Sequence, residues 1–110
     1  GAPSTCTLRA RIRFEEKTAA VLNFGDAAIV LAGHDPTTGS IIRVDERSVD
    51  LIPANGWFDL QVTRSEGRVV VHLNGLEVAS GHVAGTGPLS IALQEGRLTI
   101  EWMRIDSTLD

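Results

Sequence analysis

Several residue types and patterns are scarce in this chain of 110 residues, and each scarcity excludes a class of protein. The one cysteine, Cys6, excludes an internal disulfide and a cysteine-based zinc cluster. No apolar run approaches the roughly 20 residues of a membrane-spanning helix. Lys and Arg number 10 against 14 Asp and Glu, whereas a nucleic-acid-binding domain usually carries a basic surface. The motifs of P-loops, Gly-x-Ser-x-Gly hydrolases and His-Glu-x-x-His proteases are also missing.

Helical periodicity is absent too, and what the chain has instead is alternation of apolar and polar residues. Period two is typical of strands with one buried face. Short strands bounded by turn residues, at intervals of about 8–12 residues, favour a sandwich or a barrel. The sequence predicts an all-β domain over 1–110, with two packed antiparallel sheets and flexible ends at 1–5 and 106–110. The expected strands are 7–14, 18–24, 27–32, 41–45, 48–52, 57–63, 68–73, 76–80, 89–93 and 97–105.

The stretch 56–81 carries the strongest local signal and predicts three consecutive antiparallel strands. Asn74-Gly75 predicts a type I′ turn, because this turn requires positive φ at both central residues. A two-residue loop would pair Leu73 with Leu76 and Val71 with Val78, so these four side chains would share the core face. In the last expected strand the apolar alternation changes phase, which predicts a β-bulge near Trp102.

The face opposite that predicted core gathers polar side chains. The same register pairs His72 with Glu77, and Gln61 or Asp59 of the preceding strand would lie beside them. Planar polar groups of this kind bind sugar hydroxyls through directed hydrogen bonds, usually with an aromatic platform. We therefore treat Asp59, Gln61, His72 and Glu77 as candidate ligand-binding residues. The alternative is a solvated His–Glu pair worth less than about 1 kcal/mol.

A second candidate surface is a stripe of arginines along the first strand. Arg9, Arg11 and Arg13 alternate with apolar residues and would bind an anionic partner, since guanidinium pairs bidentately with carboxylate and sulfate. The alternative is an exposed strand face that stays soluble through its charge. Aromatic residues make up only 5% of the chain, with no Tyr, and we expect Trp57 and Trp102 to lie in the core.

The sequence offers no metal site. The turn-rich stretch 33–40 contains His34-Asp35, but one aspartate falls far short of the six to eight oxygen ligands of calcium. His34, His72 and His82 do not have metal-ligand spacing. We therefore expect no metal and no other cofactor.

The second half of the chain resembles the concanavalin A-like lectin/glucanase superfamily, especially laminin-G-like modules and the bacterial 3-keto-disaccharide hydrolase-like domain. The shared pattern is a strand opened by Trp57, a strand ending in Leu73-Asn74-Gly75, then Gly87-Pro88-Leu89, Gln94-Glu95-Gly96 and Met103-Arg104-Ile105. Where the hydrolase-like family has Gln-Asp-His-Gly this chain lacks the histidine, and Glu101 and Trp102 replace an Arg-Asn pair. The resemblance implies a jelly-roll fold without the polar groups that catalysis needs.

Together, the resemblance and the polar face predict a non-catalytic carbohydrate-binding module of a larger extracytoplasmic bacterial protein. The beginning Gly1-Ala2-Pro3-Ser4 suggests a domain cut from such a protein. Two alternatives stay open: a structural or protein-interaction domain that self-associates through a sheet edge, and a degenerate glycoside-processing enzyme, which would need two carboxylates about 5–10 Å apart. A glycan, a protein or a second copy are thus the expected partners, with no nucleic acid and no membrane span.

Overall fold

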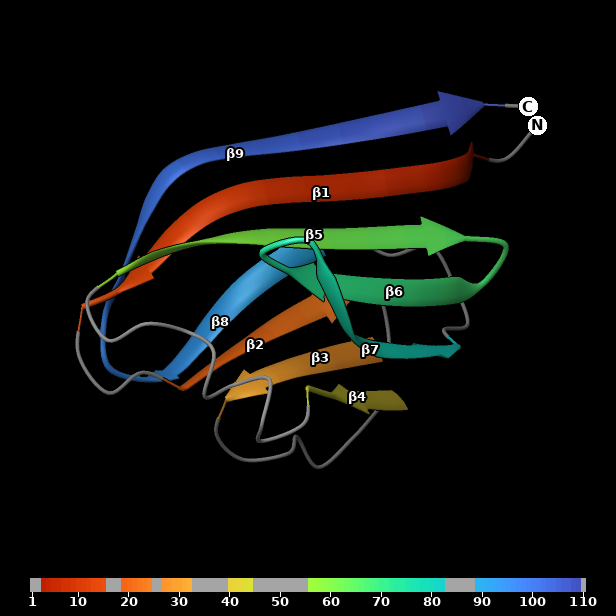
Figure 1. Ribbon diagram of the computed structural model, residues 1–110. Coiled ribbons are helices and arrows are strands. Elements are labelled where there is room, and N and C mark those ends of the chain that lie inside the picture. Colours follow the sequence, from red (N-terminus) through yellow and green to blue (C-terminus); the bar gives the residue numbers. More distant parts are fainter. Residues whose placement is uncertain are drawn as a thin grey trace.

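The structure is a computed structural model that describes residues 3–15, 19–24, 27–32, 40–44, 56–82 and 89–109. In these ranges the chain forms strands and turns, and the strands make two sheets stacked as a β-sandwich (Figure 1). The predicted all-β class and the two-sheet architecture are confirmed. The expected strand 48–52 and the His34-Asp35 stretch lie outside the described residues.

One sheet has five strands in the spatial order β7-β6-β5-β1-β9, and the other has four in the order β4-β3-β2-β8. The first sheet contains β1 (Pro3–Phe14), β5 (Trp57–Ser65), β6 (Arg68–Leu73), β7 (Leu76–His82) and β9 (Leu98–Leu109). The second contains β2 (Ala19–Phe24), β3 (Ala27–Ala32), β4 (Ser40–Arg43) and β8 (Leu89–Glu95).

The core lies between the sheets and follows the period-two pattern of the sequence. Alternate residues of β1, β5 and β6 are buried: Leu8, Ala10, Ile12, Phe14, Phe58, Leu60, Val62, Val69, Val71 and Leu73. Phe14 and Phe58 meet edge to face, with ring centroids 5.1 Å apart and an interplanar angle of 76°, an arrangement that aromatic pairs favour. Because these positions alternate, the intervening side chains project from the opposite, outer face of the five-stranded sheet.

The predicted hairpin turn is confirmed, but the register beyond it differs from the prediction. Asn74 and Gly75 have φ of 50° and 85°, as a type I′ turn requires. Leu73 pairs with Leu76 and His72 with Glu77, and then a bulge at Val78 places Ala79 opposite Val71. Leu76 was expected in the core, which is wrong, since 60% of its surface is exposed. Leu76 lies beside the turn on an edge strand. Val78 was also expected on the core face, and it is partly buried against the core together with Ala79, which the bulge places opposite Val71.

The prediction of wholly antiparallel sheets is also wrong, because β3 and β4 run parallel, with Ala27 opposite Ser40 and Val30 opposite Arg43. Parallel neighbours cannot be joined by a two-residue turn, since the chain must return along the full length of the first strand. The other strand pairs in the described ranges are antiparallel.

The bulge expected near Trp102 is present in β9. Trp102 lies opposite Arg11 and Ile100 opposite Ile12, so Glu101 is the extra residue on the bulged strand. The strands extend into the ends that the sequence suggests are flexible: Pro3 pairs with Leu109, which brings the first and last strands together (Figure 1).

Candidate functional site

A row of polar side chains crosses the outer face of the five-stranded sheet from one edge to the other. The registers place Glu77 of β7 opposite His72, His72 opposite Gln61, Gln61 opposite Arg9, and Arg9 opposite Arg104 of β9. Directly opposed residues share a face and have Cβ atoms about 4.5–5.5 Å apart. Non-local pairing of β1 with β5 and β9 therefore joins the two candidate surfaces of the sequence into one.

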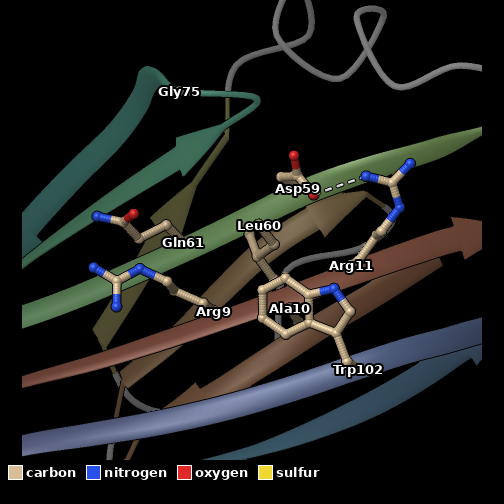
Figure 2. A pocket seen from close by; sticks show the side chains of 8 residues that line it. All are labelled: Arg9, Ala10, Arg11, Asp59, Leu60, Gln61, Gly75 and Trp102. Atoms are coloured by element: carbon tan, nitrogen blue, oxygen red, sulfur yellow. Dashed lines mark hydrogen bonds and ion pairs between the residues drawn. The ribbon is translucent and has the colours of Figure 1, made fainter.

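A groove of about 370 Å³ lies on this outer face, lined by Arg9, Ala10, Arg11, Asp59, Leu60, Gln61, Gly75 and Trp102. A second row of outward-facing residues runs next to the first: Asp59 of β5 lies opposite Arg11 of β1, and Arg11 lies opposite Trp102 of β9. The groove lies along this second row. In Figure 2 the indole of Trp102 reaches from β9 towards β1 and lies between Arg9 and Arg11, while Asp59 and Gln61 project from β5. The volume falls within the range of small-molecule sites.

The β6–β7 turn forms one wall of the groove because Asn74 fastens it to the start of β5. The backbone N–H of Asp59 donates to the Asn74 side-chain oxygen at 2.8 Å, and the backbone N–H of Asn74 donates to the Asp59 carbonyl at 2.8 Å. This reciprocal pair brings Gly75 to the groove. The Asn-Gly sequence thus has two roles: it supplies the turn and it positions a wall of the site.

Ion pairs hold the arginines without burying them. Arg11 lies 3.5 Å from Asp59 and 3.3 Å from Glu101, and Arg9 lies 3.5 Å from Asp106, all with substantially exposed side chains. Exposed pairs of this kind contribute about 0–1 kcal/mol. The guanidinium groups therefore stay exposed on the outer face, and a ligand's hydrogen bonds can replace these weak ion pairs at little cost in free energy.

The tryptophans lie on the outer face, which corrects the expectation that they belong to the core. The Trp102 side chain is 44% exposed. The half-buried Trp57 stacks under the arginine stripe, with the guanidinium carbons of Arg13 and Arg11 lying 4.9 and 5.9 Å from its ring centroid. Trp57 faces outward because the next residue, Phe58, is buried on the inner face, and Trp102 faces outward because it lies opposite Arg11, whose side chain is on the outer face.

Four of the seven candidate residues, Arg9, Arg11, Asp59 and Gln61, line the groove together. The other three lie around it: His72 and Glu77 continue the first row towards β7, and Arg13 lies beside Trp57. The Nδ1 atom of His72 is buried with no hydrogen-bond partner in the described part of the chain. Sequence reasoning missed Trp102 and Gly75. The change of phase in β9 was the available signal for Trp102, because a bulge exchanges which residues face outward.

Just after the end of β1, Glu15 links this strand to β9. Its carboxylate accepts hydrogen bonds from the Thr99 hydroxyl and from the Arg13 guanidinium, the latter at 2.8 Å. The Thr99 hydrogen bond above all, and then those from Arg13, lower the pKa of Glu15 below its ordinary value, because both stabilise the charged form.

Chemically, the groove offers donors, acceptors and an aromatic face in one place. Arg9 and Arg11 donate, Asp59 accepts, and the Gln61 amide does both. Asp59 is the one carboxylate among the described residues that line it. Within the described ranges, His, Cys, Asp and Glu side chains do not gather in threes as a metal site would need. Nor do those ranges hold a helix long and apolar enough to cross a membrane.

Comparisons with known proteins found no matching family model, no matching curated protein and no matching solved structure. The resemblance to concanavalin A-like domains thus stays a prediction from the sequence.

Proposed function

We propose that this chain is a non-catalytic binding module and that its ligand is a carbohydrate held in the groove on the outer face of the five-stranded sheet. The observation that carries the proposal is the half-exposed indole of Trp102 beside Arg9, Arg11, Asp59 and Gln61. The polar row and the arginine stripe were separate candidates in the sequence, and their convergence on one groove supports a shared role.

The chemistry of sugars matches this lining. A sugar ring presents an apolar C–H face that packs on an aromatic ring, and hydroxyls around its edge that both donate and accept. The Arg11–Asp59 pair offers donors and an acceptor side by side, and Gln61 adds an amide from the same strand. Ordering long side chains such as Arg11 and Gln61 costs conformational entropy, and the existing contact between Arg11 and Asp59 lowers that cost because it already orients the guanidinium.

We further propose that the sandwich is a jelly roll of the concanavalin A-like type, in which one outer sheet face serves as the ligand surface. The support is the two-sheet architecture and the sequence pattern from Trp57 to Ile105. The glycosidase alternative has less support, because the carboxylate near Asp59 is that of Glu101, which lies outside the groove lining and, like Asp59, is ion-paired with Arg11.

The test is calorimetric titration of the protein with a panel of neutral and anionic oligosaccharides. We expect Trp102→Ala to weaken binding of the best ligand about tenfold, since aromatic contacts of this type contribute about 0.5–1.5 kcal/mol beyond their buried area. Ile41→Ala is the matched control, because Ile41 is 42% exposed on the other sheet. Its binding should equal that of the wild type. Absence of binding to every member of the panel, or equal binding by Trp102→Ala, would refute the proposal.

A further inference from the structure

The outermost strand of the five-stranded sheet, β9, has an open edge. Within the described ranges its one strand neighbour is β1, and the top of Figure 1 shows its other side facing outward. An edge strand presents a row of backbone N–H and C=O groups that another strand can pair with. At 12 residues β9 is much longer than β7, the opposite edge strand with 7 residues, and β7 carries a bulge at Val78. Bulges and shortness blunt an edge, and β9, although it has its own bulge at Glu101, keeps a long regular stretch beyond that bulge, so β9 is the edge suited to pairing.

Three apolar side chains of β9 also lack cover on the face they share with the core. Ile100, Met103 and Ile105 lie opposite Ile12, Ala10 and Leu8, all of which are buried. The three β9 side chains are nevertheless between 38% and 53% exposed. Leu98 at the start of β9 still packs against the core, but from Ile100 to Ile105 the apolar stripe continues beyond the part that the second sheet covers.

The regular part of β9 has limits that determine where the axis of a symmetric pair would lie. The bulge at Glu101 ends the regular pairing on one side, and the strand ends at Leu109 on the other. The stretch from Trp102 to Thr108 lies between these limits, and its midpoint is Ile105. A two-fold axis perpendicular to the sheet keeps each residue on its own face, and directly opposed residues of an antiparallel pair also share a face. One residue of the strand must therefore lie opposite its own copy, and the axis passes between the two. An axis at Ile105 would use this whole regular stretch.

The charges of β9 favour the same position. With the axis at Ile105, Arg104 of each copy lies opposite Asp106 of the other, which gives two reciprocal ion pairs. An axis at Arg104 would instead place two guanidinium groups against each other, and an axis at Met103 would bring the bulge into the pairing. Arg104 and Asp106 already lie 3.0 Å apart within one copy, so both are oriented on the outer face near the edge.

We propose that two copies of this chain associate through antiparallel pairing of β9 with β9, centred on Ile105, to form a continuous ten-stranded sheet. The pairing satisfies the open backbone groups, packs Ile105 against its counterpart and covers part of the apolar stripe. Since the axis preserves faces, both grooves open on the same side of the joined sheet. The proposal rests on the edge alone and does not depend on what the grooves bind.

Sedimentation velocity over micromolar to millimolar protein tests this association. The wild type should form a dimer as the concentration rises. Ile105→Lys should raise the dimer dissociation constant at least about tenfold, because each dimer would then hold two opposed ammonium groups. Ile41→Lys is the matched control and should dimerise like the wild type. A wild type that stays monomeric throughout would overturn the proposal and leave the edge to a strand of a different partner. Unchanged dimerisation of Ile105→Lys would place the interface elsewhere and overturn it as well.

Charge exchange tests the register. Arg104→Glu places a new carboxylate opposite Asp106 of the other copy, and Asp106→Lys places a new ammonium group opposite Arg104 of the other copy. Each variant alone should therefore dimerise about tenfold more weakly. Mixed together, the two variants restore an attractive pair at both positions and should form a heterodimer with near-wild-type affinity. Circular dichroism should confirm that both variants are folded before mixing. If the mixture associates no better than either variant alone, the register centred on Ile105 is wrong.

Discussion

Gly81 on β7 provides the sharpest test of the contact between the two sheets. A Cβ atom at this position would lie 2.9 Å from Cγ1 and 3.1 Å from Cδ1 of Ile42 on β4. Contacts below 3.0 Å force a shift in a packed core, and overpacking costs about 1–3 kcal/mol. Replacing glycine also restricts the unfolded chain, which stabilises by about 0.4–1 kcal/mol. We therefore expect Gly81→Ala to lower the free energy of unfolding by about 1–2 kcal/mol, or Tm by roughly 4 °C per kcal/mol.

Chemical denaturation of a double-mutant cycle separates this clash from other causes. Ile42→Ala alone removes a buried side chain and should cost about 2–5 kcal/mol, but the cost should be smaller by at least about 1 kcal/mol in the Gly81→Ala background, where the clashing atoms are gone. Gly75→Ala is the control. A Cβ there meets nothing within 4 Å, and its cost comes from the φ of +85°, so it should show no coupling to Ile42. Stabilisation by Gly81→Ala, or additive effects of the pair, would show that the sheets do not meet at this point.

Two further predictions concern polar contacts of the five-stranded sheet. Asn74→Ala should lower the free energy of unfolding by about 1–2 kcal/mol in denaturant titration, because it removes the hydrogen bond to Asp59 and places alanine at a φ of 50°; no measurable loss would contradict the anchoring role of the turn. The hydrogen bond from Thr99 lowers the pKa of Glu15 in the folded chain, so this carboxylate stabilises the fold above its unfolded pKa, and the contribution disappears as the pH falls through the folded pKa. Glu15→Gln should therefore be less stable than the wild type at neutral pH and equal to it in strong acid, and a difference that persists unchanged into acid would contradict this.

Local patterns in the sequence predicted what local physics decides. The strand 57–63 alternates strictly, and Phe58, Leu60 and Val62 are indeed buried. The Asn74-Gly75 turn follows from backbone sterics alone. The change of phase near Trp102 correctly indicated a bulge, since a strand that alternates on both sides of an inserted residue must shift its faces.

Most features that escaped prediction depend on partners distant in sequence, whereas the bulge at Val78 lies within the β6–β7 hairpin. Parallel pairing of β3 with β4 and the bulge at Val78 leave no mark on a single strand's alternation. The groove itself requires β1 to lie between β5 and β9, since only that order sets Arg11 between Asp59 and Trp102. Exposure of Trp102 follows from the same order, because β9 is an edge strand whose outward side chains have neighbours on one side only.

The central place of β1 also governs the order in which the sheet can assemble. Both of its neighbours in the sheet are synthesised much later, because β5 begins at Trp57 and β9 at Leu98. A ribosome would thus release the first strand, with Leu8 and Ile12 exposed, long before anything exists for it to pair with. Closing such distant loops is slow, and the waiting segment is open to aggregation. Arg9, Arg11 and Arg13 give the unpaired strand a positive charge, which opposes aggregation until β5 and β9 have been synthesised and can pair with it.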